Sequence, residues 1–584
     1  MQHQTTQPPP QNPPSRPPQL SLEILIGMGV IIIALWYFSS RGNQTKIPKG
    51  MPMAREATKK EIREGIRKAK RQRAAREIGE SAVRLNPETG LMLASINPGG
   101  CIPGLSGRGK TTNAILPIIE SHAEDEDTLL ICDIKGDLMR DTAAYLHSLG
   151  YKLYFFAPGI EMPSKNSIEP VQFTGGINLL DFLNSDDDTD GTLAITRGIN
   201  VNAAESLEKR HQYFGPQGDL IQETAMLISK GTMCDDMLMV WELMGLNRLA
   251  ERLQAAYEHG QMNGIDLPYY AGHKSRGLRA VAKDKGAGNP GPTIQSTASQ
   301  TFGKFIGPKI SRCLTKTTIP LDLKGKTAVY FQIDEDSIES TAPLVATAMH
   351  MLIKRNISNR RKRDNHLVLI ADEASRYPLP DLPGWASLSR SNGFVAWLAY
   401  QQETQMQRVY QEKRWAEVSS NLPTKIYFNQ GDEKSNEIVA KALGKKTIVA
   451  ATASQSQTHG SSSSTSKNDK FEQVDLLSGP EIGKMLGRGT CAIVCEGFGA
   501  HPILYKDKPI PYQIEGPLAD ERKRRQQDWF EDLLPALQEE HEQVFGSINI
   551  QENISSRTDL AETLLPLPED YEANEIMEEL ANAV

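Results

Sequence analysis

The chain has 584 residues, enough for more than one domain and for a large buried core. Hydrophobic residues make up 39% of the chain, which excludes an intrinsically disordered protein. The formal net charge of -7 is mild and does not by itself indicate a nucleic-acid partner, although blocks of opposite charge lie along the chain.

The first 38 residues predict a disordered arm followed by a membrane span. Residues 1–19 are rich in Pro and Gln, which is typical of an extended, disordered segment. Residues 20–38 are apolar apart from Glu23 and are just long enough for a transmembrane helix, with Trp36 and Tyr37 near one end. The alternative is a cleaved signal peptide, but the segment has neither a basic start nor a small-x-small cleavage site.

Charge predicts the orientation of this span. Only Arg16 precedes it, whereas many basic residues follow it. The positive-inside rule therefore places everything after Phe38 in the cytoplasm and the arm outside. Residues 39–89 form a basic juxtamembrane segment, and its stretch EIREGIRKAKRQRAARE is either a helix near anionic headgroups or a solvated helix.

The middle of the chain predicts an α/β domain with a helical insertion. In residues 90–185 and 292–515, continuous apolar runs such as TLLICD, AVYFQI and HLVLIADE alternate with helical stretches. Such runs are typical of parallel strands buried on both faces, so we expect a doubly wound, mostly parallel sheet. Residues 186–291 lack strand signals and predict an all-α domain, with HKSRGLRAVAKDKGAGNPGP as its loop-like exit.

A phosphate-binding loop is indicated by GLSGRGKTT. Its residues fit the P-loop pattern G-x-x-x-x-G-K-[ST] and are Gly104, Ser106, Gly107, Gly109, Lys110, Thr111 and Thr112. Backbone N–H groups would point at the phosphates, the lysine would reach the β- and γ-phosphates, and the Thr111 hydroxyl would bind Mg²⁺. One feature weakens the prediction: the preceding PGGCIPG is a poor strand, although a P-loop usually follows a strand directly.

Two later strand ends supply the other groups that an ATPase needs. HLVLIADEA ends in Asp372, which can hold the Mg²⁺ shell, and Glu373, which can polarise the attacking water. FVAWLAYQQ ends in Gln401 and Gln402, of which one can sense the γ-phosphate or orient the attacking water. Because the ends of parallel strands meet at one edge of the sheet, these signals together predict a P-loop ATPase that uses ATP and Mg²⁺.

Residues 48–515 resemble the type IV coupling proteins, the TraG/TraD type of conjugation and type IV secretion ATPase in the wider FtsK/HerA group. The resemblance rests on GMPMAREATKKEI, SGRGKTTNAILP, LLICDIKGD, LLDFLN, LIADEASRYP, QQETQMQRVY and SSNLPTKIYFNQGDEKSNEIVAKALGKKTI. It implies Gln401 as the sensor, because Gln405 and Tyr410 follow it at the family's spacing. Two features depart from the family pattern: a single membrane helix, and Asp137 in place of a usual Glu.

The resemblance also implies assembly and partners. It implies a homo-hexameric ring at the bacterial inner membrane, with Arg390 as the candidate arginine that enters a neighbour's site. It further implies DNA, a relaxase or another cargo protein, and components of the secretion channel as partners. Three alternatives remain open: a protein-only export receptor, a DNA translocase unrelated to secretion, and a nucleotide-binding scaffold without turnover.

Two basic segments are candidates for the DNA contact. One holds Lys274, Arg276, Arg279, Lys283 and Lys285, and the other runs from Lys354 to Arg363. For the second segment, a solvated helix end is the favoured alternative.

The last segment, 516–584, is an acidic tail: from Asp528 on, fifteen Asp or Glu residues face one basic residue, Arg557. Alone it should be mostly disordered. Its recurring apolar residues, among them Trp529, Phe530, Leu534, Leu564 and Ile576, suggest a docking arm for a cargo protein; electrostatic shielding of a ring pore is the alternative.

Overall fold

The computed structural model describes residues 51–571 apart from residues 88, 96, 98, 204–214, 264, 284–290, 359–361, 389, 457–463, 500 and 507–516. The predicted arm and membrane span, 1–38, lie outside the described residues. Among the helices that are described, none combines the length and the apolar character that a membrane crossing requires. The chain divides into two units. One holds residues up to Met53 and a two-stranded antiparallel ribbon, β14 (Lys445–Ser456) and β15 (Ser464–Asp475); the other holds the rest.

A nine-stranded sheet forms the centre of the larger unit, in the order β17-β16-β13-β3-β12-β11-β4-β10-β5. The seven strands from β13 to β5 are parallel, and β16 and β17 join antiparallel at one edge. The strands are β3 (Gly99–Pro103), β4 (Thr128–Asp133), β5 (Lys152–Phe156), β10 (Thr327–Gln332), β11 (Leu367–Ala371), β12 (Phe394–Tyr400), β13 (Thr424–Tyr427), β16 (Cys491–Val494) and β17 (Ile503–Tyr505).

The sheet is buried on both faces, as the apolar runs predict. Alternate residues of one strand belong to different hydrophobic clusters: Leu130 of β4 packs with α5 (Thr189–Ala203) and α13 (Ile338–Asn356), whereas Ile131 packs with α3 (Leu116–Glu124) and α4 (Asp137–Ser148). The mostly parallel, doubly wound sheet is therefore confirmed. All six cysteines are free thiols, and all but Cys234 are buried.

The expectation that PGGCIPG is a poor strand is wrong, because β3 lies between β12 and β13 in this sheet. Its glycines are what the position requires. A Cβ on Gly99 would lie 2.2 Å from the Ala396 carbonyl oxygen, and one on Gly100 would lie 2.4 Å from the Thr424 carbonyl oxygen. Gly99 also has a φ of +105°, which L side chains rarely adopt. Glycine is unfavourable in most strands, but here only glycine fits between the neighbouring backbones.

Helices fill the predicted all-α region and continue beyond residue 291. They are α5, α7 (Gly215–Lys230), α8 (Met237–Gly245), α9 (Leu249–His259), α10 (Tyr269–Lys274), α11 (Arg276–Lys283) and α12 (Gly291–Gly303), with a short pair β8 (Gln261–Met262) and β9 (Ile265–Asp266). The predicted loop-like exit is wrong for residues 273–274 and 276–283, which are helical. Leu278 is buried there, and the Arg279 guanidinium lies 3.5 Å from the Tyr257 ring centroid, so tertiary packing stabilises this stretch.

The remaining helices and strands surround the sheet or lead into it. They are α2 (Lys59–Ala75), β1 (Ser81–Asn86), β2 (Leu91–Ser95), β6 (Glu161–Met162), β7 (Val171–Gln172), α14 (Leu382–Leu388), α15 (Glu403–Tyr410), α16 (Glu412–Asn421), α17 (Glu433–Leu443) and α18 (Gly479–Gly483). The basic juxtamembrane stretch forms α2, whose first turn is closed by a capping box between Thr58 and Glu61.

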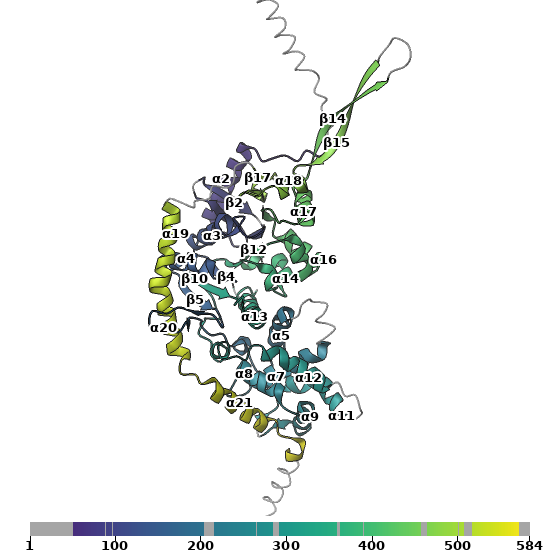
Figure 1. The fold of residues 1–584 in the computed structure, drawn as a ribbon. Coiled ribbons are helices and arrows are strands. Elements are labelled where there is room, and N and C mark those ends of the chain that lie inside the picture. The colour runs from purple at the N-terminus through teal and green to yellow at the C-terminus, as the bar shows by residue number, and fades with distance from the viewer. Residues whose placement is uncertain are drawn as a thin grey trace, which may run out of the picture. The chain divides into compact units, whose positions relative to one another are not determined.

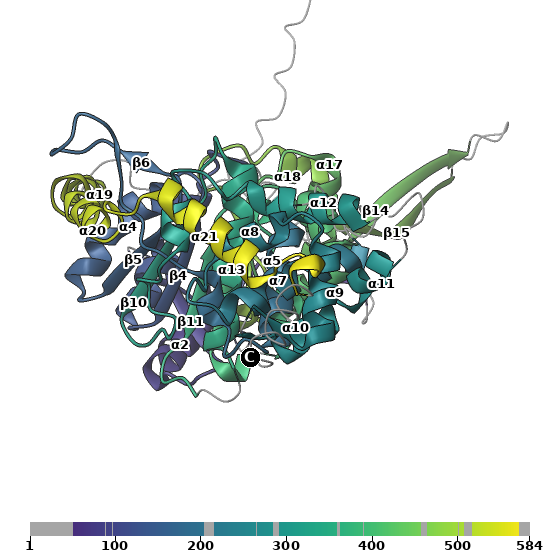
Figure 2. The ribbon, with the colours of Figure 1, turned by 90° about the horizontal axis from the view of Figure 1, so that it is seen from below.

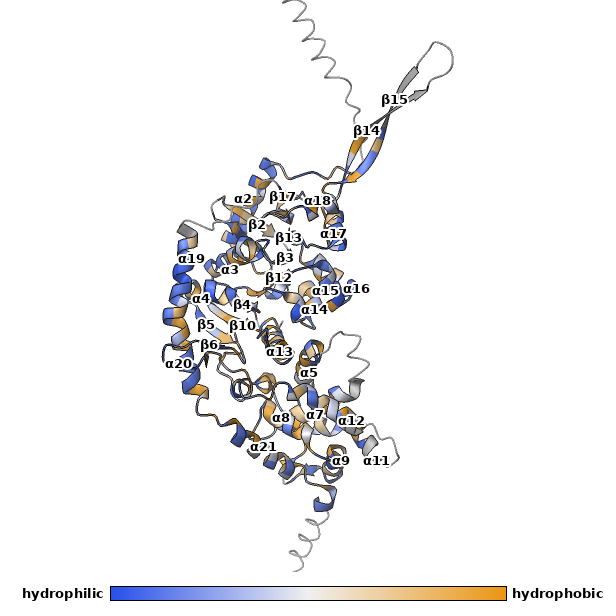
Figure 3. Ribbon diagram, viewed as in Figure 1, coloured by the Kyte–Doolittle hydropathy of each residue, from blue (hydrophilic) through white to orange (hydrophobic). Residues whose placement is uncertain are grey.

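The acidic tail is not disordered between Pro517 and Tyr571, which corrects the prediction. It forms α19 (Pro517–Asp528), a π-helical turn (Trp529–Leu533), α20 (Leu534–Phe545) and α21 (Ile550–Leu564). We call this segment the C-terminal strap. It runs beside α4 and then past α8 in both views (Figures 1 and 2), and it carries hydrophilic and hydrophobic residues in alternation (Figure 3).

Several apolar residues of the strap pack into the core of this chain. Trp529 is fully buried, with its ring 5.4 Å from Phe155 and 6.1 Å from Phe173. Leu564 and Leu565 are buried in the core shared with α8 and α9. The Arg557 guanidinium binds the Asp236 carboxylate that caps α8, with one N–O distance of 3.0 Å. These residues are therefore not available as a docking arm; Ile576 lies outside the described residues.

We expect Trp529→Ala to lower the free energy of unfolding by about 3–5 kcal/mol, because it removes a buried aromatic ring and leaves a cavity. Phe530→Ala is the matched control, since the neighbouring Phe530 is 45% exposed. Chemical denaturation followed by far-UV circular dichroism measures both variants. Equal effects of the two substitutions would show that the strap is not held by Trp529.

Candidate functional site

The carboxyl ends of six parallel strands bring together nearly all the residues that the sequence singles out. The P-loop follows β3, Asp133 ends β4, Asp372 follows β11 and Gln401 follows β12. Gln332 ends β10, and Asn429 lies two residues after the end of β13. Because β12 and β13 flank β3, the P-loop leaves the sheet with polar side chains on both sides.

Backbone hydrogen bonds fix the base of the P-loop. The Gly104 N–H donates to the Tyr400 carbonyl at 3.0 Å, and the Leu105 N–H donates to the Asn429 carbonyl at 2.9 Å. Gly107 and Gly109 have φ values of +77° and +97°, so the pattern places glycine where a left-handed backbone is needed. Ser106 and Gly107 lie exposed at the tip of the loop. The loop thus has the form of a nest of N–H groups that an anion can occupy.

Lys110 lies buried at the base of the loop, where its Nζ donates to the Gly104 carbonyl at 2.5 Å. Burial lowers the pKa of its ammonium group, and the carboxylates of Asp372 and Glu373 act against this shift. Thr111 and Thr112 are partly exposed at the start of a π-helical turn, Thr111–Ile115, that continues into α3. The Asn113 N–H donates to the Gly109 carbonyl at 2.8 Å, which joins the loop to this helix.

Asp372 and Glu373 occupy the end of β11 in different ways. The Asp372 N–H donates to the Cys132 carbonyl at 3.0 Å, which continues the pairing with β4. Burial raises the pKa of the Asp372 carboxyl, and Lys110 opposes the shift. Glu373 has a φ of +53°, a left-handed conformation that is costly for a residue with a Cβ. Such strain is typical of residues whose side chain must point in one direction.

Gln401 meets Glu373 directly. Its amide Nε2 lies 3.0 and 3.1 Å from the two carboxylate oxygens of Glu373. The neighbouring Gln402 turns away and donates to the Gln430 carbonyl at 3.3 Å. Of the two glutamines, Gln401 is therefore the one that the structure brings to the candidate base. Further along α15, the buried Tyr410 hydroxyl accepts the Leu379 N–H at 2.9 Å, so it supports the loop after Glu373.

Glu403, a buried acid two residues after Gln401, was not predicted from the sequence. The Glu403 carboxylate accepts hydrogen bonds from the Tyr400 hydroxyl and the Trp415 indole N–H, both at 2.6 Å. Its own N–H donates to the Gln430 side chain at 2.7 Å. These bonds hold the turn from β12 into α15, which carries Gln401. The signal in the sequence was an acid three residues after a tyrosine at a strand end, too common a pattern to single out.

A second missed acid is Asp133 at the end of β4. Its carboxylate accepts the backbone N–H groups of Lys135 and Leu138 at 2.9 and 2.6 Å. Burial and the nearby Asp372 raise its pKa to about 7. The motif LLICDIKGD contains this residue, but only the fold shows that it lies beside Asp372.

Arg390 is not brought to the P-loop of its own chain. It precedes β12, at the amino edge of the sheet, and donates to the Gly79 carbonyl at 2.8 Å and the Asn97 side chain at 3.3 Å. A role in a neighbouring subunit stays a prediction.

Several of the predicted DNA-binding cations have partners within the chain. Lys274 pairs with the buried Glu223, and Arg279 is buried and donates to the Gly272 carbonyl at 2.6 Å. Arg355 pairs with Asp322 at 2.9 Å. Burial lowers the pKa of Arg363 to about 10. Arg276 and Lys354 are exposed, whereas the side chains of Lys283 and Lys285 lie outside the described residues.

Comparison with known proteins agrees with the motifs. Residues 366–486 match a family model described as the TraM recognition site of TraD and TraG. The resemblance to type IV coupling proteins is confirmed. The matched segment contains Asp372, Glu373, Arg390 and Gln401 but not the P-loop. No curated protein sequence matches the chain.

Solved structures of one coupling protein share the fold. The unbound bacterial conjugative coupling protein TrwBdeltaN70 superposes with a TM-score of 0.55 at 13% identity, covering 81% of this chain and 97% of that one. TrwB in complex with ADP and Mg²⁺ gives a TM-score of 0.52 at 13% identity, covering 80% and 98%. TrwB with a non-hydrolysable GTP analogue gives 0.53 at 13% identity, covering 82% and 99%.

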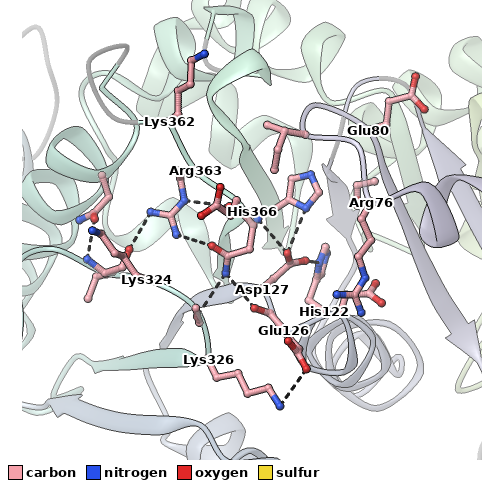
Figure 4. Close-up of a pocket in the computed structure, with 18 of the residues that line it drawn as sticks. Arg76, Glu80, His122, Glu126, Asp127, Lys324, Lys326, Lys362, Arg363 and His366 are labelled. Atoms are coloured by element: carbon pink, nitrogen blue, oxygen red, sulfur yellow. Dashed lines mark hydrogen bonds and ion pairs between the residues drawn. The ribbon is translucent and has the colours of Figure 1, made fainter.

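A separate pocket of about 390 Å³ lies at the opposite, amino edge of the sheet (Figure 4). At its floor the buried Asp127 carboxylate lies 2.8 Å from Nδ1 of His122 and 3.2 Å from Nδ1 of His366. Burial acts to raise the pKa of the Asp127 carboxyl, but the hydrogen bonds from the two imidazoles outweigh it and hold the pKa well below the usual range. Figure 4 shows Lys326 directed at Glu126 and Lys362 directed away from Asp127, so these two basic side chains do not converge.

We expect Asp127→Asn to lower the free energy of unfolding at pH 7 by about 3–5 kcal/mol, because it breaks a buried charged cluster. An acid whose pKa is depressed by folding stabilises the protein above its unfolded pKa of about 3.9, and this contribution fades as the pH falls further. The difference between wild type and variant should therefore shrink below about pH 4. Urea unfolding at several pH values measures it, with Asp364→Asn, an exposed acid of the same pocket, as the control. A difference that is constant with pH would contradict this account.

Proposed function

We propose that the protein is a P-loop ATPase that acts as a membrane-anchored coupling protein of a conjugation or type IV secretion system. The observation that carries the proposal is the pairing of Gln401 with Glu373 beside the buried Lys110 and Asp372. The contact with Gln401 holds the strained Glu373 in one orientation. A glutamate that faces a water molecule next to a phosphate chain needs such an orientation. The fold shared with nucleotide-bound structures of TrwB supports the same conclusion.

The residues at the carboxyl edge of the sheet are of the types that bind ATP and Mg²⁺, and each has a separate role. The N–H groups of the P-loop and the Lys110 ammonium bind the phosphates, and Thr111 and Asp372 hold Mg²⁺. When bound, the metal ion neutralises charge that develops on the phosphates. Glu373 takes a proton from the attacking water. Gln401 reports whether the γ-phosphate is present, because its amide can exchange the Glu373 carboxylate for a phosphate oxygen.

The cellular role rests on the resemblance to coupling proteins and on the match of residues 366–486. We infer that residues 20–38 anchor the chain in the bacterial inner membrane, with residues after Phe38 in the cytoplasm. The chain assembles into a homo-hexameric ring, receives DNA bound to a relaxase or another cargo protein, and passes it to the secretion channel.

ATP hydrolysis by the full-length protein tests the chemistry. Lys110→Ala should abolish nucleotide binding. Glu373→Gln should bind ATP but turn it over at least about 10²-fold more slowly, since it removes the general base. Glu412→Gln, an exposed acid on α16, is the control and should hydrolyse ATP like the wild type. Wild-type rates in the Glu373→Gln protein would overturn the assignment of the base.

Mixing subunits tests the role of Arg390. If Arg390 completes a neighbour's site, Arg390→Ala and Lys110→Ala proteins are each inactive, because one lacks the arginine and the other lacks the P-loop lysine. In rings mixed in equal amounts, about a quarter of the interfaces combine an intact P-loop with an intact Arg390, so activity should return to about a quarter of the wild-type level. If mixing restores nothing, Arg390 acts only inside its own chain through Gly79 and Asn97.

A further inference from the structure

A short segment before β16 is attached to the P-loop. The Gly489 N–H donates to the Arg108 carbonyl at 2.9 Å, and the Arg108 guanidinium donates to the Leu486 carbonyl. One P-loop residue thus holds both ends of the segment Leu486–Gly489. The Asn429 side chain, which belongs to the loop that also bonds Leu105, donates to the Gly483 carbonyl at 2.8 Å. The segment is therefore fixed to the phosphate loop and to the end of β13.

The packing between this segment and the loop is close. A Cβ placed on Gly109 would lie 3.1 Å from the Gly489 nitrogen and 3.2 Å from Cγ of Arg488. The aliphatic part of Arg488 therefore lies against the P-loop, and its guanidinium is within three bonds of that contact. Leu486 is 56% exposed although it stands next to a buried part of the fold. An apolar and a cationic side chain are thus presented together beside the phosphate loop.

The strand order gives the direction in which a bound nucleotide extends. The P-loop follows β3, and the candidate base Glu373 follows β11, on the β12 side of the loop. The γ-phosphate must lie toward Glu373 for hydrolysis. The other end of the molecule, which carries the nucleoside, then extends toward β13 and β16 on the opposite side of the P-loop. Leu486–Gly489 lies on that side, directly before β16.

We propose that Leu486 and Arg488 form the nucleoside-binding wall of the site, with both side chains against the face of the base. The proposal rests on the proposed binding of ATP. A planar guanidinium stacks on aromatic rings, and a leucine side chain adds apolar contact. Both contacts use the face of the ring and not its hydrogen-bonding edge. The wall therefore binds adenine and guanine with similar affinity and adds to the affinity that the phosphates supply.

Calorimetric titration of the full-length protein in detergent tests the proposal with two ligands, ATP and inorganic tripolyphosphate, each with Mg²⁺. Arg488→Ala should raise the Kd for ATP about tenfold and leave the Kd for tripolyphosphate unchanged, because the latter has no base to stack. GTP should lose affinity to the same extent as ATP.

Matched variants separate binding from folding. Lys484→Ala removes an exposed cation two residues before the segment and should bind ATP like the wild type. Leu486→Ala should weaken ATP binding, whereas Leu486→Met, which keeps the apolar volume, should not. If Arg488→Ala weakens both ligands equally, the segment only braces the P-loop, and if it weakens neither, the base binds elsewhere; either result overturns the proposal. Failure of the wild-type protein to bind ATP would instead overturn the proposed ATPase itself.

Discussion

The close approach of three backbones at β3 is the constraint on which the site depends. Gly99 and Gly100 let this strand run between Ala396 of β12 and Thr424 of β13, at distances that no side chain would allow. Only from this position can the P-loop bond to the Tyr400 carbonyl on one side and to the Asn429 carbonyl on the other. The first of these bonds sets the loop beside Gln401. The second sets it beside the loop that holds Leu486–Gly489 through Gly483.

Electrostatics at the same edge follow from burial. Lys110 is buried among carboxylates, and burial lowers its pKa while it raises the pKa values of Asp372 and Asp133. Each charge is costly alone and is made tolerable by its neighbours. In the proposed function, a bound phosphate chain with a divalent cation brings charges of both signs to this edge. The left-handed backbone of Glu373 adds strain that is offset by the pairing of β11 with β4 and β12.

Local chemistry explains which features were predictable from the sequence. Gly104 to Thr112 and the pair Asp372 and Glu373 carry their signal in residue type and spacing, and the apolar runs located the parallel strands. β3 was missed because its glycines are favourable only through contacts with residues some 300 positions away in the chain, at Ala396 and Thr424. The helix α11 was missed, and in the fold the tertiary contacts of Leu278 and Arg279 stabilise it. Leu486–Gly489 carries no motif at all, and only its bonds to Arg108 reveal it.

The acidic composition of the C-terminal strap predicted a disordered arm, but the strap packs against the rest of the chain. Its many acidic residues indicated a disordered arm, because like charges repel one another. In the fold, Trp529 enters the core beside Phe155, while Phe530, Glu531 and Asp532 remain exposed. Arg557 then joins the strap to the cap of α8 in the helical region, so one segment binds both the sheet and the helices. The inner side of the strap already packs against the sheet and the helical region. A partner that recognises this part of the chain must therefore bind the acidic outer side or the residues after Tyr571.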